Sequence, residues 1–149
     1  MMMKLFNSTF EVSLRALLLL SVTDGENMTL DRIAAYDFIA IYSRNFGLAD
    51  TNLHGDNDYG FSELSTRRAV LQEALKTLVL DGLVKATRRS EGFCFEIGET
   101  GRKFCRGQKT EYASTYRQLV KTAHKKYETL SEVELMTVIS RKSTEALRR

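Results

Sequence analysis

Residues 64–97 read LSTRRAVLQEALKTLVLDGLVKATRRSEGFCFEI, and their pattern gives the strongest indication of the fold. Its first half has apolar residues at helical spacing, so one face of a helix is expected to be buried. The helix is expected to end at Asp81-Gly82, because glycine adopts the left-handed conformation that ends many helices without steric cost. The apolar face consists of Val70, Leu71, Ala74, Leu75, Leu78 and Val79.

The second half of the stretch changes to the two-residue period of β-strands. Polar and apolar residues alternate from Val84 to Arg88 and again from Phe93 to Ile97, with a turn at residues 90–92 between them. This pattern predicts a β-hairpin. A helix followed directly by a hairpin is typical of the recognition helix and wing of a winged helix. We therefore predict a mainly α protein: a winged-helix domain, with a two-stranded β-hairpin wing, and additional C-terminal helices.

Two helices are expected before this stretch. Ser8 and Glu11 have the spacing of a capping box, so the first helix should run from there to about Val22. Its leucine run at residues 17–20 makes it the most buried helix. That run is much shorter than the roughly 20 residues that cross a membrane, and no cleavage site follows it. We therefore predict a cytoplasmic protein without a membrane partner.

The second helix should begin after Thr29, a candidate N-cap, and end near Ser43. Tyr36 and Asp37 are expected on the side opposite its apolar face, exposed to solvent. The apolar face consists of Ile33, Ala34, Phe38, Ile41 and Tyr42.

Residues 45–60 form the longest irregular stretch, and loops of this length are usually functional or mobile. The loop holds His54 and several aspartates, and residues 56–60 begin like a calcium-binding loop. However, Phe61 and Arg67 occupy the sixth and twelfth positions, where such a loop needs glycine and glutamate. We therefore predict no metal site.

Three helices are expected after the hairpin. Glu99 or Thr100 should cap a short one, and apolar residues at helical spacing over residues 112–127 predict a second. Ser131 and Glu134 form another capping box, which should begin the last helix. Its apolar face is expected to contain Leu135, Met136, Val138 and Ile139.

The chain of 149 residues is long enough for one core without disulfides or metals, and its two cysteines are expected to be free thiols. We divide it into a winged-helix domain at residues 1–107, including the loop at 45–60, and a helical extension at residues 108–149 packed on the same core. Residues 102–149 contain 12 Lys or Arg and 5 Asp or Glu, a net charge of +7. The remaining residues have a net charge of −4, from 10 Lys or Arg and 14 Asp or Glu.

Few residues could support catalysis. His54 and His124 are the two histidines, and His124 is expected on a solvated, lysine-rich helical face. The sequence contains neither a phosphate-binding glycine loop nor a nucleophile elbow. We therefore predict that the protein is not an enzyme and needs no cofactor, and a hydrolase with a novel site is only a remote alternative.

The basic residues are candidates for DNA contact. Arg67 and Arg68 lie at the start of the expected recognition helix, and Arg88 and Arg89 lie beside the wing tip, where winged helices meet DNA. The rest of the exposed helix face is nearly neutral, which is unusual for a helix that reads sequence. DNA contact and protein docking are therefore both open. Further candidates on the basic C-terminal helix are Lys121, Lys125 and Lys126.

Apolar residues in the long loop are candidates for docking a partner, because exposed apolar groups in a loop are costly unless something covers them. The alternative is that they fold back onto the domain. The docking candidates in the loop are Leu48, Leu53, His54, Tyr59 and Phe61. The basic C-terminal helices are a second candidate surface for docking a partner.

The order of several short motifs resembles a known family, over about residues 5–140. These motifs are residues 6–11, 30–33, 36–38, 53–55, 61–64, 67–68 and 82–84. Together they resemble the small middle component of bacterial ABC-type three-component systems, which include the Lamassu anti-phage and anti-plasmid systems. His54-Gly55 stands where such relatives usually have a His-Pro step, which bears on the conformation of the loop.

The resemblance implies a non-catalytic accessory or scaffold subunit. Such a subunit docks on an SMC-like coiled-coil ATPase and helps to hold or regulate an effector subunit, often a nuclease. It implies no catalytic residues, and any DNA contact within the complex would be independent of sequence. The alternative is a stand-alone winged-helix transcription regulator that binds DNA as a homodimer.

Overall fold

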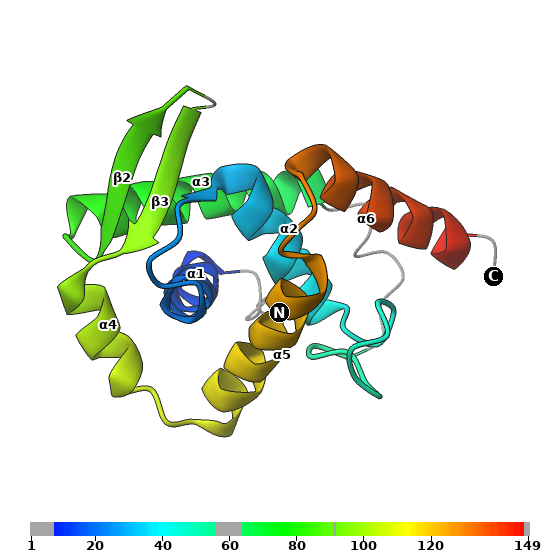
Figure 1. Cartoon of the computed structure of the whole chain (residues 1–149). Helices are drawn as coiled ribbons and strands as arrows, with labels where there is room; N and C mark the ends of the chain where they lie inside the picture. The colour runs from blue at the N-terminus through cyan, green and yellow to red at the C-terminus, as the bar shows by residue number, and fades with distance from the viewer. Residues whose placement is uncertain (1–7, 56–63, 91, 148–149) are drawn as a thin grey trace.

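The computed structural model describes residues 8–55, 64–90 and 92–147. This part of the chain contains six helices and a small antiparallel sheet with strand order β1-β3-β2 (Figure 1). The elements are α1 (Thr9–Val22), β1 (Met28–Thr29), α2 (Leu30–Ile41), α3 (Leu64–Leu80), β2 (Val84–Arg89), β3 (Gly92–Ile97), α4 (Glu99–Arg106), α5 (Glu111–Tyr127) and α6 (Glu132–Leu147). The mainly helical class predicted from the sequence is confirmed.

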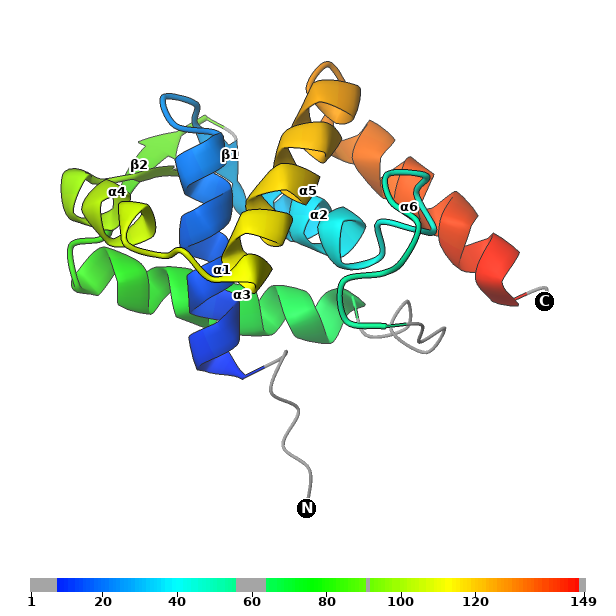
Figure 2. The same ribbon diagram turned by 90° about the horizontal axis from the view of Figure 1, so that it is seen from below.

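Helix α1 lies at the centre of the fold, with α3, α4 and α5 packed around it (Figure 2). Its N-terminus is fixed as predicted, because the Ser8 hydroxyl accepts a hydrogen bond from the Glu11 amide at 3.2 Å. The leucines at residues 17–20 are all buried, as the apolar run predicted. A single apolar core joins residues from α1, α2, α3, α5 and α6.

Helix α2 begins as predicted, with the Thr29 hydroxyl accepting a hydrogen bond from the Arg32 amide at 3.1 Å. The prediction that Tyr36 and Asp37 are exposed is wrong, because both are buried. Helix α5 packs against α2 and covers the side of α2 that bears these two residues. A polar residue can be buried there because its partners come from other helices, which the sequence of α2 alone does not reveal.

Helix α3 ends as predicted. Gly82 has a φ of 79°, and its amide donates to the Val79 carbonyl while the Leu83 amide donates to the Leu78 carbonyl. These two bonds form a Schellman motif, which satisfies the last carbonyls of the helix and turns the chain into β2.

The predicted hairpin is also confirmed. Strands β2 and β3 pair in register from Val84 opposite Ile97 to Arg89 opposite Gly92. Strand β1 was not predicted; its Met28 pairs with Phe95 on the other side of β3. Two residues give no detectable period, so this strand can be recognised only in the folded chain.

The prediction that Glu99 or Thr100 caps helix α4 is wrong. Gly98 is the N-cap and provides no side-chain hydrogen bond. Its amide donates to the Leu83 carbonyl, and a Cβ atom at Gly98 would lie 3.3 Å from the same oxygen. The close packing of this corner on the end of α3 therefore favours glycine over a capping side chain.

Gly101 has even less space. A Cβ atom there would lie 2.4 Å from the Leu83 carbonyl oxygen and 2.8 Å from Cγ1 of Ile97. We expect Gly101→Ala to lower the free energy of unfolding by about 1–3 kcal/mol, because backbone has to move to admit the methyl group. Urea unfolding followed by circular dichroism measures this. The control is Ser114→Ala, because Ser114 is exposed. Gly25→Ala would not serve, because Gly25 has a φ of 88°. Equal stability of Gly101→Ala and wild type would contradict the prediction.

Helix α6 is capped as its sequence predicts. In α6 the capping box is complete, because the Glu134 amide donates to Ser131 Oγ and the Ser131 amide donates to the Glu134 carboxylate. Leu135 and Ile139 are buried as predicted, whereas Met136 is 37% exposed. Helix α6 packs on α2 and extends away from the other helices toward the C-terminus (Figure 1).

The described part of the long loop is irregular but ordered by its own hydrogen bonds. Asn52 is buried, and its side chain accepts from the Arg44 amide and donates to Asn45 Oδ1, both at 2.9 Å. Phe46 is also buried and lies in the core. None of the helices in the described residues is long and apolar enough to span a membrane.

Candidate interaction site

A buried ionic centre connects α1, α2 and α5. Arg15 Nε donates to the Asp37 carboxylate at 2.8 Å, and the Tyr116 hydroxyl donates to the same carboxylate oxygen at 2.6 Å. Burial alone would raise the pKa of Asp37, but the Arg15 charge and the two hydrogen bonds hold this pKa below its usual value. Burial opposes the charge on Arg15, whose pKa is nevertheless raised by Asp37. The ion pair is therefore charged on both sides inside the core.

The long loop is attached next to this centre. The His54 ring stacks on Tyr112 of α5, with Nε2 of His54 2.8 Å from the Tyr112 hydroxyl. Burial, together with the positive charge of Arg15, lowers the pKa of His54 to about 3, so this histidine is neutral at physiological pH. Of the other docking candidates in the loop, Leu48 and Leu53 are half-buried and pack against the core. Tyr59 and Phe61 lie outside the described residues.

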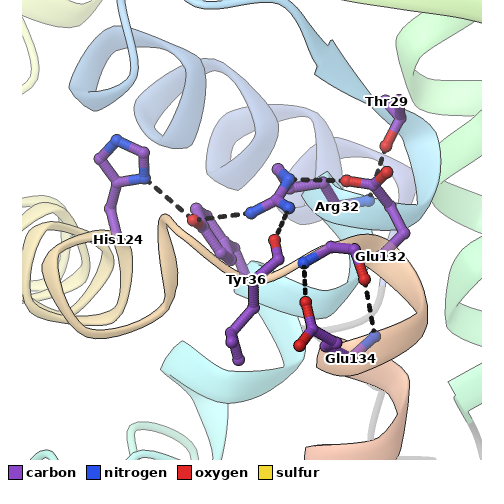
Figure 3. Close-up of polar contacts among 8 residues, drawn as sticks. Thr29, Arg32, Tyr36, His124, Glu132 and Glu134 are labelled. Atoms are coloured by element: carbon purple, nitrogen blue, oxygen red, sulfur yellow. Dashed lines mark hydrogen bonds and ion pairs between the residues drawn. The ribbon is translucent and has the colours of Figure 1, made fainter.

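A second polar network joins α2, α5 and α6 (Figure 3). Arg32 donates to the Glu132 carboxylate at 2.8 Å, to the Leu130 carbonyl, and to the Tyr36 hydroxyl at 3.2 Å. The Tyr36 hydroxyl in turn lies 2.9 Å from Nδ1 of His124. Arg32 thus ties α6 and its preceding turn to α2.

The prediction of a solvated His124 is wrong. Its side chain is only 15% exposed, and its Nε2 atom lies 2.7 Å from the Glu26 carboxylate. The lysines beside it in the sequence suggested an exposed face. In the folded chain, the turn after α1 brings Glu26 over this position and partly covers it.

We expect Arg32→Ala to loosen α6 because it removes the hydrogen bonds that fix the α5–α6 turn. The loss should be about 1–3 kcal/mol of stability, with the Glu132 carboxylate and the Leu130 carbonyl left without this donor. Hydrogen–deuterium exchange of Arg32→Ala should be faster than that of wild type in α6, with a smaller change in α3. As a control, Arg44→Ala, on an exposed loop residue, should leave exchange in α6 unchanged. Unchanged protection of α6 in Arg32→Ala would contradict the assigned role.

The outer face of α6 borders an open groove of about 700 Å³. Val133 is 76% exposed and Met136 37% exposed, and the start of α2 contributes Asp31 to the rim. Contiguous exposed apolar patches mark surfaces that bind another protein, and Val133 and Met136 are neighbours on the helix surface, three residues apart. The groove is also lined by Thr137, Ser140 and Arg141.

The four candidate DNA-contacting arginines differ in their surroundings. Arg67 is partly buried, with its guanidinium 5.9 Å from the centre of the Tyr42 ring. Arg68 pairs with Asp31 at 2.6 Å. Arg88 and Arg89 are exposed on the hairpin, and Arg88 lies over the ring of Phe93, which is itself exposed.

The three candidate lysines of α5 also differ. Lys121 and Lys125 are exposed, whereas Lys126 donates to the Phe46 carbonyl at 3.0 Å and lies over the Tyr127 ring. Lys126 thus helps to hold the loop against α5.

Within the described residues, no three His, Cys, Asp or Glu side chains are grouped so that they could bind a metal. Asp56 and Asp58 of the loop lie outside these residues.

Comparison with known protein families assigns the chain to one of them. Residues 5–149 match the family model of the ABC-three component (ABC-3C) system Middle Component 2. The protein belongs to this family. A middle component of a three-component system has partner components, so an accessory role follows from this membership. Searches of curated proteins and of solved structures found no match.

Sequence reasoning missed two features of this middle component. The ionic centre had one visible signal, because Arg15 interrupts an otherwise apolar helix and must find a partner when that helix is buried. The groove had a weaker one: Val133 lies between the capping residues Ser131 and Glu134, away from the predicted apolar face. Its exposure becomes evident only once the packing of α6 on α2 is known.

Proposed function

We propose that this middle component is a non-catalytic accessory subunit of a Lamassu-like anti-phage or anti-plasmid complex. In this proposal it docks on an SMC-like coiled-coil ATPase in the cytoplasm and helps to hold or regulate an effector nuclease. The observation that carries the proposal is the match to Middle Component 2 over residues 5–149. The exposed side chains of Val133 and Met136 on α6 support it, because an accessory subunit needs a surface for its partners.

We place docking on the α6 groove rather than on the long loop. Leu48 and Leu53 already pack against the core, whereas Val133 is 76% exposed and Met136 37% exposed. The Arg32 network holds the start of α6 on α2, so this groove has a fixed shape before a partner arrives. A preorganised surface binds with a smaller loss of conformational entropy. The occupant in this proposal is an apolar helix face of the ATPase component.

We also propose that α3 and the β2–β3 hairpin are arranged as the recognition helix and wing of a winged helix, with residues 108–149 as its helical extension. The exposed face of α3 contains Glu73 and Lys76, which pair with each other at 3.6 Å. With Arg67 turned toward Tyr42 and Arg68 paired with Asp31, this face has little free positive charge for reading bases. The arrangement therefore favours a docking module over a stand-alone regulator.

Affinity purification of the tagged protein from its native host, followed by mass spectrometry, tests the proposal. We expect a large coiled-coil ATPase and an effector nuclease to remain bound at moderate salt. A homodimer bound to a specific DNA sequence, without an ATPase, would instead establish the regulator and contradict the proposal. The untagged strain serves as the control for non-specific recovery.

A further inference from the structure

A second hollow of the molecule shares no lining residue with the α6 groove, and most of its charged lining residues are basic. It has a volume of about 470 Å³ and opens between the end of α1, helix α4 and the start of α5. In Figure 2, α4 and α5 lie on the two sides of α1, and the segment that joins them crosses α1. Its charged lining residues are Asp24, Arg102, Arg106, Lys109 and Arg117.

The lining has four positive side chains and one carboxylate. The Asp24 carboxylate forms an ion pair with Arg102, whose Nε lies 2.7 Å from Oδ2 of Asp24. In the described part of the chain, no carboxylate forms an ion pair with Arg106, Lys109 or Arg117. Cys105, which also lines the hollow, adds no negative charge, because burial raises the pKa of its thiol.

Arg117 is held in place by backbone oxygens instead of a carboxylate. It donates to the Gln108 carbonyl at 2.7 Å and to the Cys105 carbonyl at 3.3 Å. These bonds orient the guanidinium without neutralising its charge. Arg106 and Lys109 are exposed at the same hollow and can move toward a ligand.

We propose that this hollow, the α4–α5 pocket, binds phosphate groups of a nucleic-acid backbone. An oriented guanidinium and two mobile cations match successive phosphates better than they match a single carboxylate. The +7 net charge of residues 102–149 would attract a polyanion to this end of the chain. The inference does not depend on the proposed ATPase partner, because the full chain alone presents the pocket. It predicts binding that does not depend on base sequence.

Fluorescence anisotropy of the full chain with a labelled duplex of about 20 base pairs tests this, as a function of salt. We expect Arg106→Glu/Lys109→Glu to weaken binding about tenfold and to make its salt dependence shallower. The matched control is Lys76→Glu/Lys142→Glu, which changes the net charge equally away from the pocket and should weaken binding less than about threefold. Thermal melting by circular dichroism checks that both variants are folded. Arg117→Lys keeps the charge but loses the planar fork, and it should also weaken binding.

The possible outcomes are distinct. Equal weakening in the pocket variant and in the control would overturn the proposal, because attraction would then be diffuse. Absence of DNA binding by the wild type at low salt would also overturn it. In a competition experiment, unlabelled duplex should displace the probe far better than polyglutamate at equal charge concentration. Equal displacement by polyglutamate would show that the pocket accepts an acidic protein and would overturn the assignment to phosphate.

Discussion

Replacing Asp37 by alanine is expected to lower the free energy of unfolding by about 3–5 kcal/mol, the largest effect of any single change considered. The Arg15 side chain is only 1% exposed, and its guanidinium would lose the carboxylate that balances its charge. Tyr116 would lose the acceptor for its buried hydroxyl at the same time. Urea denaturation followed by circular dichroism measures the change.

The exposed ion pair between Glu73 and Lys76 gives a matched control for Asp37→Ala. Glu73→Ala should cost less than about 1 kcal/mol, because water already solvates both charges. The double variant Arg15→Met/Asp37→Leu should recover much of the stability lost in Asp37→Ala, since no unpaired charge remains. Similar small losses in Asp37→Ala and Glu73→Ala would contradict a buried, charged centre.

The second large effect is a loss of stability as pH falls below about 6.5, the pKa of an unperturbed histidine. In the folded chain His54 has a pKa of about 3, so the unfolded state binds a proton there that the folded state does not. Stability from the neutral ring is therefore fully present above pH 6.5 and decreases toward pH 3. The slope approaches about 1.4 kcal/mol per pH unit, which gives about 2–3 kcal/mol between pH 6.5 and 4.

The variant His54→Gln isolates this contribution because glutamine does not titrate and can still reach the Tyr112 hydroxyl. Denaturant unfolding at several pH values should show a shallower dependence for His54→Gln than for wild type between pH 6.5 and 4. Asp37 acts in a lower range: its pKa is held below the usual value, so its contribution is lost only below about pH 4. Parallel pH curves for wild type and His54→Gln would contradict a buried neutral His54.

The local elements of the fold were predictable from the sequence because their signals lie within a few residues of each other. The end of α3 at Gly82 and the capping of α6 by Ser131 and Glu134 depend on short-range geometry alone. The strands of the hairpin likewise show their period directly. Helix α4 is the exception, since Gly98 was selected by its contact with Leu83 rather than by capping chemistry.

The polar centres were not predictable because their partners are far apart in the chain. Asp37 was expected in solvent on the amphipathic pattern of α2, yet its partners come from α1 and α5. His124 was expected in solvent because lysines lie beside it in the sequence, yet its partner Glu26 lies 98 residues away. Sequence periodicity reports which face of a helix is apolar, but it does not report how many neighbours the helix has.

Docking of the ATPase component through α6 can be tested by co-purification of the assembled system. The measurement compares the amount of ATPase component recovered with tagged wild type, with Val133→Asp/Met136→Asp, and with Leu80→Asp. Leu80 is a matched control because it is 80% exposed, similar to the 76% of Val133, but lies at the end of α3. We expect the ATPase to be lost with Val133→Asp/Met136→Asp and retained with Leu80→Asp. Full recovery of the ATPase with Val133→Asp/Met136→Asp would contradict the account.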